Sequence, residues 1–359
     1  MIDPHVHLRD WAQAEKETLS HGIRLAAESA IDAVFDMPNT DPPLTDPDTV
    51  RRRLSEAEEI VADLETSFRY GVFCGAVPDR QALERLVELY HGERLGRNGR
   101  QVGIVGFKLY AGPSTGSLAA EEFDAQRDVY AALSALEYGG VICVHAEKSR
   151  LFLRTPDGNL DWDPSRPQTY ASARPPKAEA ASVRDQIVAA EEADFAGTLH
   201  IAHVSVPEVV EIIEEARGRV GFRISCEATP HHLLLSEQAL SGPDGILWKT
   251  NPPLRPEALR TELYRMLTAG RIDFVASDHA PHSRADKLDG YASGVPGIAV
   301  MHAFRTRLRD EGVDERLLAR LFHDGAEEIY GVDIPESAVV TRADGRFDYP
   351  TNPYSLDII

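Results

Sequence analysis

The stretch DPHVHLRD, residues 3–10, is the most informative for the fold, because it combines the pattern of a β-strand with side chains that can do chemistry. Side chains alternate between the two faces of a strand, so His5, His7 and Arg9 share one face. The other face carries the apolar side chains of Ile2, Val6 and Leu8. Basic and metal-ligating groups are costly to bury in the apolar core of a sheet. This face is therefore expected to look into a polar site.

Similar short apolar runs recur along the chain and alternate with segments of helical period. The expected strands cover residues 2–8, 32–38, 68–76, 102–110, 140–147, 198–205, 222–229 and 273–280. The expected helices cover residues 46–64, 79–90, 121–136, 177–193, 206–217, 256–268 and 297–311. A long polar loop is expected over residues 154–176. This alternation predicts an α/β protein, and eight strands favour a closed (β/α)8 TIM-type barrel over an open sheet.

Seven of the eight expected strands end in side chains that can do chemistry. These are His5 with His7, Asn39, Lys108, His145, His203, Glu227 and Asp278. An open sheet would spread such residues along a line, whereas a barrel gathers the strand ends on one face, where the active sites of this fold lie. The pattern supports the barrel and predicts a site at its C-terminal face.

Composition narrows the class of protein. The 359 residues are 43% hydrophobic, which is enough for a large core, and they carry a net charge of −20 without a basic stripe. Binding to nucleic acid or to an anionic membrane is therefore not expected. No apolar run reaches about eighteen residues and the N-terminus lacks a secretory pattern. The three cysteines lie in separate apolar runs, which indicates buried thiols and a cytoplasmic location.

The histidines at the strand ends suggest a metal site. Neutral imidazole suits zinc and similar ions, and Asp278 would add a carboxylate. Each histidine also has a simpler interpretation. His5 and His7 could be hydrogen-bonded within a polar strand, and His145 or His203 could each be a satisfied core residue. Their convergence favours metal ligation.

Lys108 is unusual because it closes a buried strand. A bare ammonium is costly to bury, so the amine must be paired, deprotonated or modified. One interpretation is an ion pair with Asp278 or Glu227. The other is carboxylation by CO2, which yields an anionic carbamate with two oxygens that can bridge two metal ions.

At this point the residues carry a resemblance. The motifs DPHVHLRD, DMPNT, GFKLYAG, HIAHVS, CEATPHHL, NPPLR and SDHAPH resemble, in order, those of the dihydroorotases of the amidohydrolase superfamily. The resemblance covers residue 3 to about residue 300. H-x-H alone marks only the superfamily. MPNT together with H-x-H-x-R and SDHAPH separates dihydroorotases from the related hydantoinases and allantoinases.

The resemblance implies two zinc ions per subunit. His5, His7 and Asp278 would hold one ion, His145 and His203 the other, and carboxylated Lys108 would bridge both. The residues implied to bind the substrate are Arg9, Asn39, Asn251, His282, Ser293 and Gly294.

The implied activity is the reversible cyclisation of N-carbamoyl-L-aspartate to L-dihydroorotate in de novo pyrimidine synthesis. A hydroxide between the two metals would be the nucleophile in the hydrolytic direction, with Asp278 as general base. Arg9 would read the substrate carboxylate through its planar guanidinium fork. The simpler interpretation of Arg9 is a surface ion pair with Asp10.

Two departures from the family pattern bear on organisation and metal content. Only four residues precede His5, so the small β-sandwich of relatives is expected to be absent or much reduced. The expected units are a barrel over residues 1–330 and a tail over 331–359 that packs on it. Ala202 replaces a cysteine that helps bind a third zinc in some relatives, so Glu227 is expected to support a histidine instead.

Two alternatives remain at this stage. The first is another cyclic-amide hydrolase of the hydantoinase or allantoinase type. The second is a non-catalytic dihydroorotase homologue that scaffolds aspartate transcarbamoylase. The partner is expected to be a small-molecule substrate. A homodimer and an association with aspartate transcarbamoylase stay open.

Overall fold

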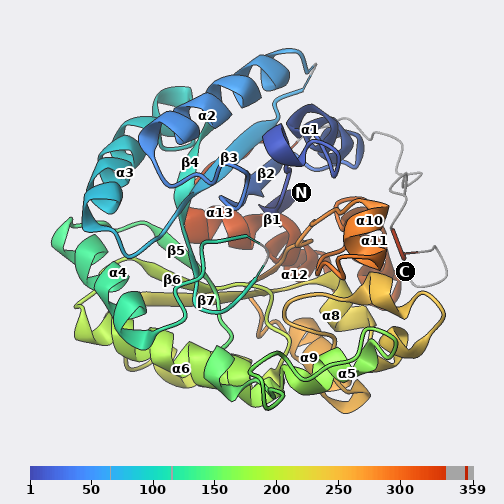
Figure 1. The fold of residues 1–359 in the computed structure, drawn as a ribbon. Helices are drawn as coiled ribbons and strands as arrows, with labels where there is room; N and C mark the ends of the chain where they lie inside the picture. The colour runs from blue at the N-terminus through green and yellow to red at the C-terminus, as the bar shows by residue number, and fades with distance from the viewer. Residues whose placement is uncertain (65, 115, 337–351, 355–359) are drawn as a thin grey trace.

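The computed structural model describes residues 1–359 except 65, 115, 337–351 and 355–359. Its centre is a sheet of eight parallel strands that follow one another in chain order, surrounded by helices (Figure 1). The strands are β1 (Ile2–Val6), β2 (Ala33–Asp36), β3 (Arg69–Gly75), β4 (Val102–Tyr110), β5 (Val141–His145), β6 (Thr198–Ile201), β7 (Arg223–Ala228) and β8 (Phe274–Val275). The expected barrel is confirmed.

The barrel closes between β1 and the segment that follows β8. Val6 pairs in parallel with His279, and the backbone N–H of His7 donates to the carbonyl of His279 at 2.8 Å. The carboxylate of Asp3 accepts the backbone N–H of Ser277 at 2.9 Å. The first and last strands are thus joined directly.

Every expected helix is present, with ends that differ by a few residues. Asp46 caps the first of them: its carboxylate accepts the N–H groups of Asp48 and Thr49, and Pro47 occupies the first turn. The α-helices are α1 (Leu19–Glu28), α2 (Pro47–Ala62), α3 (Arg80–Glu93), α4 (Phe123–Ala135), α5 (Gln168–Ala173), α6 (Pro176–Glu192), α7 (Pro207–Arg217), α8 (Pro230–Leu234), α9 (Glu257–Thr268), α10 (Arg284–Leu288), α11 (Val300–Asp310), α12 (Glu315–Ala319) and α13 (Gly325–Tyr330). Short 3-10 turns and one π-helical turn (Arg320–Asp324) join some of them.

The interior of the barrel is filled at its N-terminal end by α13, which Figure 1 shows in red inside the ring of outer helices. The ring of Tyr330 lies 4.9 Å from that of Phe35 and 5.8 Å from that of Phe73, edge-on in both cases. It also lies 6.2 Å from the ring of Phe274. This aromatic packing closes one end of the barrel and leaves the other end for polar groups.

A β-bulge in β1 corrects one expectation from the sequence. The pairing register of β1 with β2 shifts between Asp3 and Val6. As a result Ile2 packs in the interior cluster, while Val6 and Leu8 pack in the outer core against the helices. The grouping of Ile2 with Val6 and Leu8 on one face was wrong, because a bulge inserts one residue and reverses the alternation.

The expected polar loop over residues 154–176 is also only partly right, since it contains α5. The three cysteines are buried and free, as expected. Within the described residues no helix is long and apolar enough to cross a membrane. Most of the expected tail over 331–359 lies outside the described residues, but Tyr354 is buried against Trp248, with ring centroids 4.9 Å apart. The division at residue 330 stays a prediction.

Candidate active site

The C-terminal ends of the strands surround a cleft. Its lining is His5, His7, Arg9, Asn39, Lys108, Tyr110, Ser114, His203, Asn251, Asp278, Ala280, Ser293 and Gly294. Ten of the twelve residues predicted from the sequence belong to this lining. The other two lie directly behind it: His145 contacts His203, and His282 hydrogen-bonds the carbonyl of Ser293. The structure therefore brings all twelve together.

Three predicted ligands form a compact group. The Nε2 atoms of His5 and His7 lie 3.4 and 3.1 Å from Oδ1 of Asp278. Their Nδ1 atoms face outward, that of His5 to Glu227 at 2.5 Å and that of His7 to Asn39 at 2.6 Å. Acceptors at Nδ1 fix the tautomer in which Nε2 is free of a proton. In that tautomer the two Nε2 atoms and Oδ1 of Asp278 converge on one point, where they could hold a metal ion.

His145 and His203 form a second group. Nδ1 of His145 lies 3.1 Å from Nε2 of His203. Two nitrogen ligands of a tetrahedral zinc ion, with bonds of about 2.05 Å, lie roughly 3.3 Å apart. Nδ1 of His203 has no hydrogen-bond partner among the described residues. The ring centroid of His203 is 5.3 Å from that of His5, so the two groups share one site.

Lys108 is buried, with 1% of its surface exposed, and lines the cleft together with the predicted histidine ligands. Its Nζ lies 3.6 Å from Sγ of Cys143 and 5.4 Å from the ring centroid of Tyr110. No ion pair joins it to a carboxylate in the described part of the chain, so the alternative of an ion pair with Asp278 or Glu227 was wrong. An unmodified ammonium in this position would be costly. The environment suits an amine that has been converted to an anion.

The electrostatics of the site favour neutral imidazoles and an ionised carboxylate. Burial lowers the pKa of His7 to about 4, and it also lowers the pKa values of His145 and His203. Burial alone would raise the pKa of Asp278, but His5, His7 and His203 outweigh it and hold that pKa well below its usual range. Neutral imidazoles and a carboxylate are the protonation states that bind a metal ion.

Glu227 supports the site from inside the barrel. Its carboxylate accepts from His5, from Nε2 of His200 at 3.0 Å, and from the backbone N–H of His203 at 3.2 Å. This confirms the expectation that Glu227 supports a histidine. His200, on the neighbouring strand β6, was not predicted from the sequence. Ala202 packs in the interior apolar cluster.

Arg9 lines the cleft, and not all of the N–H groups of its guanidinium have hydrogen-bond partners among the described residues. It is 2% exposed, donates from Nε to the carbonyl of Pro281 at 3.3 Å, and lies 3.5 Å from His282 through Nη2. Its Nη1 has no hydrogen-bond partner in the described residues. The carboxylate of Asp10 instead accepts the N–H groups of Trp11 and Leu19. The alternative of a surface ion pair between Arg9 and Asp10 was therefore wrong.

Backbone strain marks the same region. Arg9, His203 and Asp278 have φ values of 45°, 37° and 47°, which L-residues rarely adopt. Such strain persists only where the surrounding structure fixes it, and it is typical of functional sites. Nothing in the residue types predicted these conformations.

The sequence reading missed several residues of the site. Tyr110 lines the cleft two residues after Lys108, so strand alternation alone places both on one face. Tyr170 donates to Oδ1 of Asn251 at 2.5 Å, but it lies in a helix within an expected loop and gave no signal. Arg174 and Glu147 form a buried ion pair behind His145.

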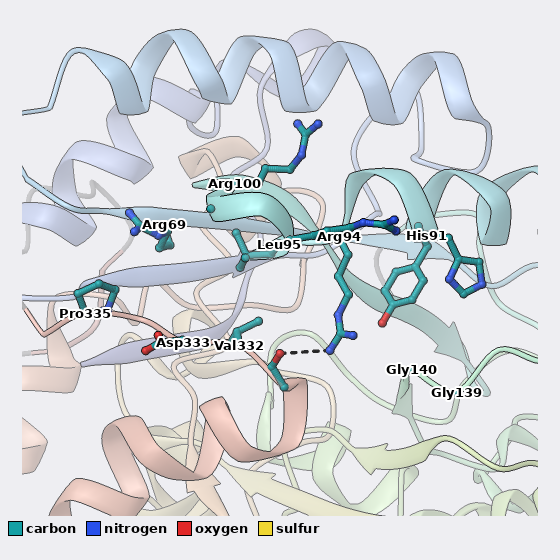
Figure 2. Close-up of a pocket in the computed structure, with 15 residues that line it drawn as sticks. Arg69, His91, Arg94, Leu95, Arg100, Gly139, Gly140, Val332, Asp333 and Pro335 are labelled. Carbon is teal, nitrogen blue, oxygen red and sulfur yellow. Dashed lines mark hydrogen bonds between the residues drawn. The ribbon is translucent and has the colours of Figure 1, made fainter.

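A second, larger hollow lies at the N-terminal end of the barrel, between the turn after α3 and the end of α13 (Figure 2). Three of the four arginines that line it, Arg69, Arg94 and Arg100, are already engaged. Arg94 donates to the carbonyls of Tyr330 and Gly331, and Figure 2 marks the second of these bonds. Arg69 donates to backbone carbonyls and Arg100 pairs with two glutamates. The hollow does not carry a comparable group of reactive side chains.

Comparisons with known proteins show the family and the fold. No protein-family model matches the chain. It is 31% identical to a dihydroorotase of Thermococcus kodakarensis over 98% of this chain and 74% of that protein. It is 35% identical to a dihydroorotase of Halobacterium salinarum over 83% of this chain and 63% of that protein. The chain thus spans between about three-fifths and three-quarters of these relatives.

Solved structures show the same fold. An L-hydantoinase (dihydropyrimidinase) from Arthrobacter aurescens matches 92% of this chain and 70% of its own, with a TM-score of 0.74 and 21% identity. A dihydroorotase from Campylobacter jejuni matches 93% of this chain and 84% of its own, with a TM-score of 0.66 and 20% identity.

The barrel with histidines, a lysine and an aspartate at its strand ends, together with the sequence match to dihydroorotases, makes the chain a member of the amidohydrolase superfamily. Within it, the chain belongs to the dihydroorotase family.

Proposed function

We propose that the protein interconverts N-carbamoyl-L-aspartate and L-dihydroorotate. The observation that carries this proposal is Arg9. A buried guanidinium with an unpartnered Nη1 faces the same cleft as the predicted metal ligands. Arginine binds carboxylates through parallel charge-assisted hydrogen bonds, and dihydroorotate carries a carboxylate on its ring. A neutral cyclic amide would leave this cation without a partner.

The residues present fit a two-metal centre. His5, His7 and Asp278 would hold one ion, and His145 and His203 would hold the other. The buried Lys108 would bridge both as its carbamate. Zinc is the proposed metal, because nitrogen-rich sites with this spacing suit it. When bound, such ions polarise a carbonyl and lower the pKa of water to near neutrality.

The side chains of the protein would then do the rest. Arg9 would hold the ring carboxylate, with Asn39 and His282 beside it. Asn251 and the backbone at Ser293 and Gly294 would contact the ring. Asp278 would accept a proton from the attacking water and return it to the departing amide nitrogen, and ring closure would reverse these steps. The homodimer and an association with aspartate transcarbamoylase stay predictions.

Hydantoinases share this fold, so the substrate must be tested directly. The metal-loaded protein should hydrolyse dihydroorotate, and metal analysis should find two ions per chain. Arg9→Met should reduce kcat/KM for dihydroorotate by at least about tenfold, since a hydrogen bond to a charged group contributes roughly 1.5–3 kcal/mol. Dihydrouracil, the same ring without its carboxylate, should be affected little.

The ratio of the two losses cancels general damage to the variant. Equal losses on both rings would contradict the assignment of Arg9 to the carboxylate. Hydrolysis of hydantoin in preference to dihydroorotate by the unmodified protein would instead identify a hydantoinase. A protein that binds metal but hydrolyses none of these rings would support the non-catalytic alternative.

A further inference from the structure

A second buried cation lies just outside the cleft. Lys249 is 6% exposed, and its ammonium donates to Oγ of Ser293 at 2.7 Å and to the carbonyl of Tyr291 at 2.8 Å. It also lies over the rings of Tyr170, at 3.9 Å, and Trp162, at 5.1 Å. The partners of this ammonium are thus neutral oxygens and aromatic faces.

No carboxylate pairs with Lys249 among the residues that the structure describes. The groups that face it are Tyr170 from α5, Arg174 directly after α5, Lys287 from α10 and Tyr291 from the following loop. The charge of Arg174 is itself paired with Glu147. Burial, and then the charge of Arg174, lower the pKa of Lys249 to about 7. Among the described residues, the ammonium of Lys249 therefore has no counter-charge.

Lys249 is joined to the cleft wall at several points. Ser293 lines the cleft directly, and the hydroxyl of Tyr170 lies 3.4 Å from Oγ of Ser293 while donating to Asn251. The backbone N–H of Gly294 donates to the carbonyl of Lys249 at 2.8 Å. Any molecule that contacts Ser293 in the cleft would therefore be linked to the ammonium of Lys249 through the Ser293 side chain.

We propose that Lys249 is a positioning residue that selects an anionic substrate, acting through Ser293 and the 291–294 loop. This inference rests on the proposed function and extends it: the carboxylate of the substrate is the counter-charge that Lys249 lacks. Arg9 binds the anion directly, and Lys249 attracts it through the loop that closes against the ring. A neutral ring gains nothing from this charge.

The same arrangement couples binding to a proton. Anion binding favours the charged form of Lys249, so its pKa rises in the complex. Above pH 7 the free protein has lost much of this charge and must take up a proton when the anion binds. Affinity for a carboxylate should therefore fall as pH rises above about 7, by at most about tenfold per pH unit.

The test uses the full metal-loaded chain and three variants. Lys249→Met removes the charge, Lys249→Arg keeps it at every pH used, and Lys177→Met makes the same change at an exposed lysine on α6 as a control. KM and kcat are measured for dihydroorotate and dihydrouracil between pH 6.5 and 8.5. Isothermal titration with orotate, which keeps the ring carboxylate, is run in two buffers of different ionisation enthalpy.

At pH 6.5, Lys249→Met should raise KM for dihydroorotate at least about tenfold, with kcat within threefold and dihydrouracil unaffected. Lys249→Arg should restore the low KM and remove its rise with pH. At pH 8, orotate binding should take up between about half and one proton in the unmodified protein and none in either Lys249 variant. Lys177→Met should match the unmodified protein throughout.

Absence of proton uptake in the unmodified protein overturns the proposal without recourse to any variant. Equal effects of Lys249→Met on the two rings, or a loss in kcat that Lys249→Arg does not restore, would reduce Lys249 to a structural role. Failure to hydrolyse dihydroorotate would overturn the proposed function instead, and the titration with orotate would still decide whether Lys249 responds to an anion.

Discussion

The two ends of the barrel are built for different purposes. At the C-terminal end, buried charges and imidazoles face a cleft and the backbone is strained, and one polar atom each of Arg9 and His203 has no partner among the described residues. At the N-terminal end, the ring of Tyr330 fills the interior among other aromatic rings. The first end loses stability in order to present reactive groups, and the second supplies packing that compensates. Substitutions at the two ends should therefore separate activity from stability.

The largest effect is expected for Lys108→Ala. Without a bridging anion, metal binding should fall and turnover of dihydroorotate should be abolished. A small carboxylic acid in the buffer should restore part of the activity by taking the place of the carbamate. Metal content and turnover are measured with and without the acid. Full activity without the additive would show that Lys108 bridges nothing.

The second largest effect is expected for Asp278→Asn. The amide keeps the shape of the side chain but cannot accept a proton, so kcat should fall by about a hundredfold or more. Dihydroorotate affinity should change far less. Metal content is measured alongside, because the carboxylate is also a predicted ligand. A variant with normal turnover and weaker binding would assign the proton transfer to another group.

The third largest effect is expected for Glu227→Gln, which tests whether Glu227 holds His5 in position from inside the barrel. The carboxylate orients His5, and loss of such a partner lowers metal affinity by about 10- to 100-fold. Activity in excess zinc should recover much of the loss, whereas melting temperature should change little in the metal-loaded protein. Titration of the apo protein with zinc gives the affinity. Unchanged affinity would mean that His5 is held by the strand alone.

The smallest effect is expected for Tyr330→Phe. The hydroxyl of Tyr330 is buried and has no hydrogen-bond partner in the described residues, so its removal should leave stability unchanged or slightly higher. The kinetics should be those of the unmodified protein. Thermal unfolding followed by circular dichroism is the measurement. A clear fall in melting temperature would reveal a bond that this hydroxyl makes.

Much of the site could be predicted because parallel strands bring distant residues to one edge. The convergence of His5, His145, His203 and Asp278 followed from eight strands whose ends meet on one face, whereas the ligand sets and the substrate-contacting residues came from the resemblance to dihydroorotases. Lys108 needed in addition the cost of burying an amine. These inferences depend on the chain direction and on residue chemistry, and both can be read from the sequence.

The remainder depended on contacts that periodicity does not encode. The bulge that moves Ile2 to the interior adds one residue without any distinctive side chain. Lys249 gained its importance from loop contacts with Ser293, and Tyr170 from its bond to Asn251. Loops carry no period, so the partners of their side chains become known only when the fold is complete.

The pairing of β1 with the segment after β8 determines when the predicted ligands can come together during folding. His7 and Asp278, which meet there, are separated by 271 residues. During synthesis His5 and His7 leave the ribosome long before Asp278 is made. The group of three predicted ligands is therefore incomplete until late in synthesis. Closing so long a loop costs entropy, which the contacts of the docked last strand must offset. The three predicted ligands therefore meet only once the barrel is closed.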